Sequence, residues 1–157
     1  MLTTTSTYAL IAMSTMCRNQ DRLPLTAHEL AELGGVPSNY LSKIMRQLVR
    51  ADLLQGSRGI GGGFRFARPP SEIRLAEIVD LFESVDRPRT CPFGNSVCSD
   101  EEPCGIHERW GAVCSNFLEV LKETSLETAA AKPVNKTKTK SKTVTRPVKK
   151  NRRRERK

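Results

Sequence analysis

The sequence predicts a mainly α-helical chain with one small β-hairpin and a long helix toward its C-terminal end. Apolar residues recur at helical spacing in three successive segments, and two short strand-like pieces then flank a glycine-rich loop. The chain has 157 residues, which is room for one compact domain and an extension. This length argues against a multidomain enzyme.

Three helices are expected within residues 1–50. The first has an apolar face that holds Tyr8, Ile11, Ala12, Thr15 and Met16. Thr26 and Glu29 have the spacing of a capping box, which opens a second helix running through Leu33 and ending at Gly34 and Gly35. The third helix begins at Ser38, and its apolar stripe is Leu41, Ile44, Met45, Leu48 and Val49.

The opposite face of the third helix is polar and lacks carboxylates. It carries Ser38, Asn39, Ser42, Lys43, Arg46, Gln47 and Arg50. A helix that presents hydrogen-bond donors and positive charge fits the major groove of DNA. We therefore expect this face to contact a duplex.

Residues 53–67 predict the hairpin, whose loop contains Arg58 and Gly59 among five glycines in the segment. Three helices followed by a hairpin predict a winged helix-turn-helix domain. The glycines allow backbone and Arg58 to approach a duplex closely. A nucleotide-binding loop is the rival interpretation, but the segment lacks the Gly-Lys-Ser/Thr ending of a P-loop, and Phe64 stands where a dinucleotide fingerprint requires its third glycine.

A fourth helix is expected around Leu75 to Phe82, and a loop of about twenty residues follows it. Cys91, Cys98 and Cys104 are separated by six and five residues, and His107 comes soon after. Three thiolates and an imidazole can converge on one metal centre. Zinc and an iron–sulfur cluster both suit these donors, and the wide gaps favour a cluster. Three unconnected thiols in a loop remain the alternative.

The other two cysteines, Cys17 and Cys114, lie within helical patterns and are expected to be small core residues. His28 is expected to be a solvated helix residue. The last helix should run from about Ile106 to Ser125, with an apolar stripe of Trp110, Val113, Phe117, Val120 and Leu121. That stripe fits either intradomain core or a two-fold dimer seam, and the seam is favoured because helix-turn-helix proteins match their symmetry to two half-sites.

Charge is segregated along the chain, whose net charge is +9. Residues 132–157 hold 13 of the 26 Lys and Arg residues and one of the 17 acidic residues. This composition, without aromatic residues, predicts a disordered basic tail over 131–157 that neutralises phosphates on any duplex. A purely solubilising extension is the alternative.

Four motifs together resemble the bacterial IscR/NsrR/RirA-type family of winged-helix, iron–sulfur-cluster-binding transcription regulators. They are Thr7-Tyr8-Ala9-Leu10, Ser38-Asn39-Tyr40-Leu41, Ser57-Arg58-Gly59-Ile60-Gly61-Gly62-Gly63-Phe64 and the three spaced cysteines. The resemblance covers about residues 1–127. It implies a homodimer that binds operator DNA, and it implies that Cys91, Cys98 and Cys104 hold the cluster with His107 as the fourth ligand. A 2Fe-2S cluster is favoured and a 4Fe-4S cluster is possible.

The expected organisation is a winged helix-turn-helix domain over 1–85, a cluster-binding loop over 86–107, a dimerisation helix over 106–127 and the basic tail over 131–157. The expected DNA contacts are Ser38, Asn39, Tyr40, Ser42, Lys43, Arg46, Arg58 and Gly59. We expect a cytoplasmic, homodimeric repressor of double-stranded operator DNA, with no small-molecule substrate, no membrane association and no catalytic site, whose operator affinity responds to iron, redox state or nitric oxide. The alternatives are a small zinc- or thiol-dependent redox enzyme and a nonspecific nucleic-acid-coating protein.

Overall fold

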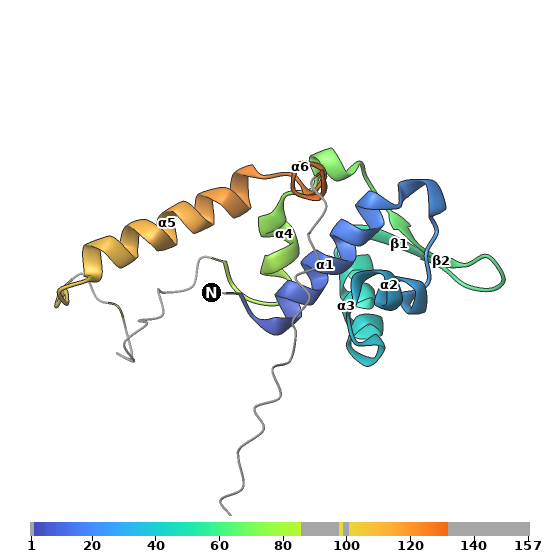
Figure 1. Cartoon of the computed structure of the whole chain (residues 1–157), viewed down its shortest axis with the longest axis horizontal. Helices are drawn as coiled ribbons and strands as arrows, with labels where there is room; N and C mark the ends of the chain where they lie inside the picture. The colour runs from blue at the N-terminus through green and yellow to red at the C-terminus, as the bar shows by residue number, and fades with distance from the viewer. Residues whose placement is uncertain (1, 86–97, 99–100, 132–157) are drawn as a thin grey trace, which may run out of the picture.

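A computed structural model describes residues 2–85, 98 and 101–131 (Figure 1). The helices of this part are α1 (Thr4–Arg18), α2 (Ala27–Gly34), α3 (Ser38–Arg50), α4 (Leu75–Asp80), α5 (His107–Glu123) and α6 (Leu126–Ala130). Strands β1 (Leu54–Ser57) and β2 (Gly63–Phe66) form one antiparallel hairpin, and single 3-10 turns lie at Gln20–Arg22 and Pro70–Glu72. The predicted fold, mainly α with a small hairpin, is confirmed.

Helix α1 begins where Thr3 caps it, its side chain accepting a hydrogen bond from the Ser6 backbone N–H. Its fully buried apolar residues are Ala9, Ala12, Met13 and Met16. The predicted face was therefore displaced by part of a turn, because Tyr8 and Ile11 are only partly buried against the core. Small residues at positions 9 and 12 let the neighbouring helices approach α1 closely.

The predicted capping box opens α2. The Thr26 hydroxyl accepts from the Glu29 N–H at 3.2 Å, and the Glu29 carboxylate accepts from the Thr26 N–H at 2.8 Å. The backbone hydrogen bond from Thr26, followed by the bond from its hydroxyl, lowers the pKa of Glu29. Gly35 ends the helix in the left-handed conformation at φ 66°, and α3 begins three residues later with the predicted stripe facing inward.

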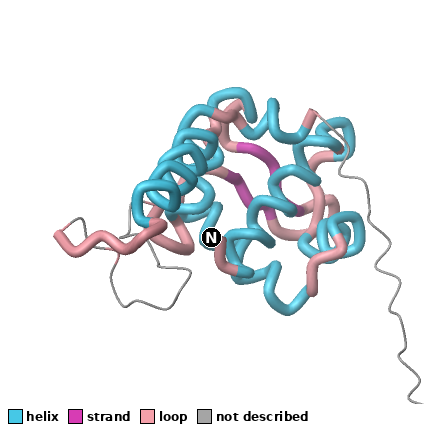
Figure 2. Tube along the Cα trace, turned by 60° about the vertical axis from the view of Figure 1, so that its left-hand side comes forward, coloured by secondary structure: helices cyan, strands magenta, loops and turns pink. Residues whose placement is uncertain are grey.

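The hairpin is tied to the helices by a third extended segment. Leu54 pairs with Phe66 and Ser57 with Gly63 within the hairpin. Leu25, just before α2, exchanges two backbone hydrogen bonds with Phe64 at 3.1 and 2.8 Å. A Cβ at Gly63 would lie 2.7 Å from the Leu25 backbone, so this close approach requires glycine. Figure 2 shows the two strands near the middle of that view, with helices around them.

The C-terminal part differs from the prediction. Helix α5 ends at Glu123, Thr124 is extended, and Ser125 caps the separate helix α6 by accepting from the Thr128 N–H at 3.2 Å. Leu126 is fully buried in the main core, where α6 packs on α1. The helix expected over 106–127 is therefore interrupted at Thr124. The winged helix-turn-helix domain was expected to end at residue 85, but its core also includes Leu126 of α6.

Helix α5 extends as an arm from the body of the molecule, which consists of α1, α2, α3 and the hairpin (Figure 1). Its C-terminal half packs on α4 through a small second core of Ala76, Val79, Val85 and Leu121, with Phe117 and Leu118 at its margin. The join is fixed by backbone hydrogen bonds from Leu75 N–H to the Thr124 carbonyl and from Leu126 N–H to the Ile73 carbonyl. Within the residues placed by the structure, no helix is long and apolar enough to cross a membrane.

Candidate nucleic-acid interface and cysteine–histidine pair

The solvent face of α3 presents the side chains expected to contact DNA. Leu41, Ile44, Met45 and Leu48 are buried on the inner face. Helical geometry therefore directs the opposite side outward, and Ser38, Asn39, Ser42, Lys43 and Arg46 are all exposed. The Arg46 Nε donates to the Ser42 carbonyl at 3.0 Å, which lays its guanidinium along the helix surface.

Tyr40 lies at the edge of this face. Its side chain is 55% exposed, and its ring is tilted 58° against that of Tyr8, with centroids 6.1 Å apart. It borders a groove of about 450 Å³ between α1, α3 and the residues after α4. The lining residues are Thr5, Asn39, Tyr40, Lys43, Ile44, Gln47, Leu81 and Phe82. Tyr40 is therefore partly turned from the outward face of α3 toward α1.

The hairpin supplies a second basic surface. Arg58 and Gly59 are exposed at its loop, and Gly59 has a φ of 94°, a conformation that suits glycine. Arg65 on β2 is also exposed, directly across the hairpin from Gln55. Arg65 is not among the DNA contacts expected from the sequence, although its position between Phe64 and Phe66 in an alternating strand predicts an outward side chain.

Both surfaces have the same charge. No acidic residue occurs over 33–51 or 53–71, whereas Lys43, Arg46, Arg50, Arg58 and Arg65 are exposed there. Exposed basic residues on stretches of chain that lack carboxylates attract the phosphates of nucleic acid. His28, expected to be solvated, has a side chain 77% exposed beside Glu32.

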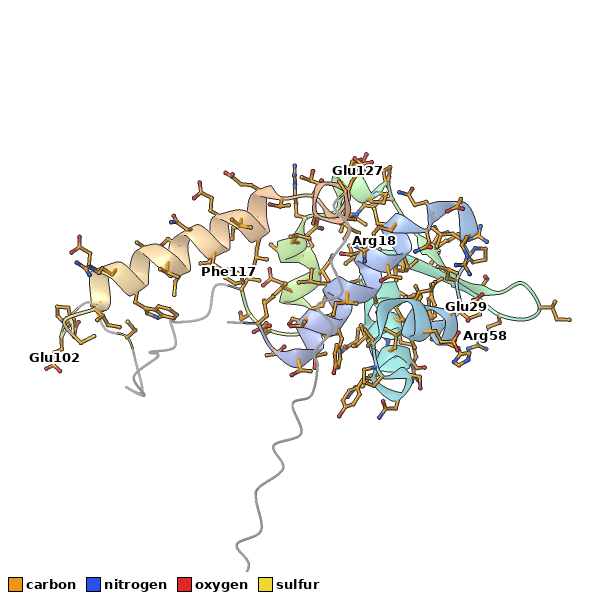
Figure 3. All side chains as sticks on the ribbon, in the orientation of Figure 1. Arg18, Glu29, Arg58, Glu102, Phe117 and Glu127 are labelled. Atoms are coloured by element: carbon orange, nitrogen blue, oxygen red, sulfur yellow. The ribbon has the colours of Figure 1, made fainter. Side chains whose placement is uncertain are left out.

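The cysteine and histidine residues expected to bind metal lie near the free end of the arm, where Figure 3 labels Glu102. Arg58 of the hairpin lies at the opposite end of the molecule. The Cys98 Sγ lies 3.4 Å from the Nδ1 of the His107 ring. The backbone N–H of His107 donates a hydrogen bond to the Cys104 carbonyl at 2.9 Å. Cys104 is exposed. Cys91 lies outside the described residues. Among the residues that are described, no group of three or more His, Cys, Asp and Glu is close enough to hold a metal ion.

Of the four predicted ligands, the structure thus brings Cys98 and His107 together. Cys17 and Cys114 are both half-buried, not fully buried as core residues would be. Burial raises the pKa of the Cys17 thiol, and the hydrogen bond from Gln20 offsets part of this rise. Cys17 packs at the margin of the main core, whereas Cys114 lies on the arm.

Three packed helices, an exposed donor-bearing third helix and an adjacent basic hairpin define a winged helix-turn-helix DNA-binding protein. The particular family follows from comparison with known sequences. Residues 2–132 match the family Rrf2, described as an iron-dependent transcriptional regulator. Because the match spans most of the chain, this protein belongs to that family and is a transcriptional regulator, as the motif resemblance predicted.

Individual relatives agree. The chain is 30% identical over 122 residues to an Aquifex aeolicus protein named as an HTH-type transcriptional regulator, covering 76% of this chain and 84% of the relative. It is 30% identical over 127 residues to the HTH-type transcriptional regulator IscR of Photorhabdus laumondii, covering 80% and 76%. The solved structure of CymR, the global cysteine regulator of B. subtilis, is similar with a TM-score of 0.68 and 24% identity, covering 83% of this chain and 96% of CymR.

Proposed function

We propose that this protein is a homodimeric repressor whose affinity for operator DNA is controlled by an iron–sulfur cluster. The single observation that carries the proposal is the approach of the Cys98 thiol to the His107 imidazole at the start of α5. The expected DNA contacts on α3 and the hairpin are exposed and include the basic residues Lys43, Arg46 and Arg58, and IscR is among the relatives. Cys98 and His107 at the far end of a helical arm would connect cluster state to DNA binding.

The Cys98–His107 pair fits two ligands of one metal. Metal–sulfur and metal–nitrogen bonds of about 2.3 and 2.1 Å at a tetrahedral angle place the two ligand atoms about 3.6 Å apart. The distance in the structure is 3.4 Å. We assign Cys91 and Cys104 as the remaining ligands from their spacing. A bound 2Fe-2S cluster would supply one-electron redox chemistry and sensitivity to oxidants or nitric oxide.

The rest of the chain links this site to the DNA-binding surfaces. At the other end of α5, the Arg74 guanidinium donates to the Glu123 carbonyl at 2.8 Å. The Arg74 backbone N–H donates to the Glu77 carboxylate, and Glu77 also pairs with Arg68, which lies two residues after the end of β2. A displacement of the arm would therefore shift residues that lie next to the hairpin. Such local changes can bias a two-state geometry of the dimer.

The dimer proposal rests on the exposed apolar residues of the arm. Val113 and Val120 are 49% and 55% exposed, and Trp110 and Phe117 are only partly buried. Apolar residues repeating along an exposed helix are typical of a surface that a second helix covers. Pairing of two arms would set the distance between two recognition helices.

The proposal is tested by anaerobic purification with absorption spectroscopy and iron and sulfide analysis. We expect a coloured protein with two iron and two sulfide per chain. Cys98→Ala should abolish the cluster, and His107→Ala should leave a weaker or more labile one. Cys114→Ala is the matched control, because Cys114 lies on the same helix as His107. This variant should keep the cluster. A colourless protein with zinc, or full iron and sulfide in Cys98→Ala, would contradict the assignment.

A thiol-based regulator is the second candidate, because the same Cys98–His107 contact suits a thiol that exchanges its proton with an imidazole. It predicts loss of DNA binding on oxidation in protein that contains no iron. Iron analysis therefore separates the two candidates.

A further inference from the structure

The tip of the hairpin carries two side chains. Between Ser57 and Phe64 the residues are Arg58, Ile60 and four glycines. Ile60 has a relative exposure of 109%, and no other large hydrophobic side chain that the structure places is as exposed. An isoleucine at the apex of a basic hairpin is neither core nor an electrostatic contact.

The backbone of the loop fixes this presentation. Gly59 and Gly61, on either side of Ile60, have φ values of 94° and 74°. The Gly62 N–H donates to the Gly59 carbonyl at 3.0 Å. A Cβ at Gly62 would lie 2.6 Å from the Ser57 carbonyl oxygen, so a larger residue would open the turn. The glycines therefore hold Ile60 at the apex and leave the ribbon beside it without side chains.

We propose that Ile60 enters the minor groove of operator DNA as an apolar wedge and selects deformable base steps. This inference rests on the proposed DNA-binding function. The minor groove is about 6 Å wide, and a ribbon flanked by glycines is narrow enough to approach it. In this proposal α3 occupies the major groove and the hairpin reaches the adjacent minor groove, where the positive charge of Arg58 is favourable.

The chemistry of the side chain defines what it recognises. Isoleucine has no hydrogen-bonding group, so it does not read base edges. Inserted apolar side chains instead contact the sugars and partly unstack a base step, which is easiest at pyrimidine–purine steps such as TA. The exocyclic amine of guanine obstructs the floor of the groove. Ile60 therefore favours a TA step and disfavours G·C pairs beneath the wing.

The test begins with selection of preferred duplexes from a randomised library by the full-length protein. Affinity is then measured for the best duplex and for a version whose TA step under the wing is replaced by GC. We expect the wild-type protein to prefer the TA duplex by about tenfold, and Ile60→Ala to lose most of that preference and to bend the duplex less in a fluorescence-transfer assay. Ile60→Leu keeps the apolar volume and should retain the preference.

Several outcomes would overturn the inference. Ile60→Ala could bind both duplexes like the wild-type protein, or it could change the oligomeric state, which would assign Ile60 to a contact between copies of the chain. Wild-type protein that selects no sequence would overturn the proposed function itself and this inference with it. Equal thermal unfolding of Ile60→Ala and wild type, expected for so exposed a residue, separates loss of contact from loss of fold.

Discussion

The body of α1, α2, α3 and the hairpin is stabilised differently from the α5 arm. Helix α1 buries six of its 15 residues, whereas α5 buries two of its 17, Gly111 and Leu121. Most residues of the main apolar core lie in the body, with Ile73, Ile78 and Leu126 added from later in the chain, and the arm leaves Val113 and Val120 exposed. The comparison shows that the body is stabilised mainly by buried apolar residues, whereas the arm leaves an apolar surface that the proposed second chain and metal centre would complete.

The largest expected effect is in the body. Leu48 is fully buried in the main core, so Leu48→Ala leaves a cavity and should lower the free energy of unfolding by about 3 to 5 kcal/mol. Val120→Ala on the exposed side of the arm should change the unfolding of the monomer by less than about 0.5 kcal/mol. Chemical denaturation of both variants at low protein concentration measures the difference. Equal losses would show that the two regions do not differ as described.

The arm should respond instead through association. Val113→Glu would bury a charge in the proposed seam and should weaken dimer formation by about 2 to 3 kcal/mol. Ser115→Glu, at a position that is also exposed but lies on another side of α5, is the matched control and should leave the dimer intact. Sedimentation over a concentration series measures both. A wild-type protein that remains monomeric at high concentration would remove the basis for the seam.

Within the body, DNA affinity should depend on the exposed face of α3 and on the hairpin more than on other exposed positions. Arg46→Ala or Arg58→Ala should weaken binding to the selected duplex by about 1 to 3 kcal/mol if each makes a good base contact. Arg18→Ala, an exposed arginine at the C-terminal end of α1, removes the same charge away from the interface and should have a smaller effect. Gel-shift titrations in which all three variants match the wild type would refute the assigned surface.

The join between body and arm should show the smallest effect. Burial by itself would raise the pKa of Glu77, but the bonds from the Arg74 N–H and the Arg68 guanidinium outweigh it and lower that pKa. A lowered carboxyl pKa gives stability that is present above the ordinary value and is lost as pH falls through the folded-state value. Glu77→Gln should therefore destabilise the protein at neutral pH by less than about 1 kcal/mol, because the pair is partly exposed.

This loss should shrink as the pH falls below the folded-state pKa of Glu77. Denaturation at neutral and acidic pH, with the exposed Glu32→Gln as control, measures it. A loss that grows on acidification would have the wrong sign.

The same comparison explains which features could be predicted from sequence. The bounds of α3 and the capping box of α2 followed from local pattern, since an apolar stripe and a Thr–Glu spacing act within one helix. The structure of the residues beyond 123 could not be predicted from local pattern, because Leu126 is buried against α1, which is distant in sequence. The same holds for Leu25, whose bridge to Phe64 depends on the fold and on the missing side chain of Gly63.

For the site, residue type and spacing gave the basic face, and the structure adds orientation. Tyr40 was grouped with the other residues of α3, and only the three-dimensional fold shows its ring against Tyr8. The spacing of the cysteines and histidine also predicted Cys98 and His107 as ligands of one metal. Their contact in the structure depends on how the chain turns into α5. The exposure of Ile60 could have been inferred from its flanking glycines, yet its use as a contact follows from its place at the apex.

The central claim is that the cysteine–histidine end of the arm controls DNA affinity, and the most direct measurement is operator affinity with and without the metal centre. The selected duplex would be titrated anaerobically with wild-type protein and with Cys98→Ala, each taken through cluster reconstitution and, separately, through metal removal. We predict a difference of about 5- to 150-fold between the two wild-type forms and none between the two preparations of Cys98→Ala. Equal affinity of cluster-loaded and metal-free wild-type protein would contradict the account.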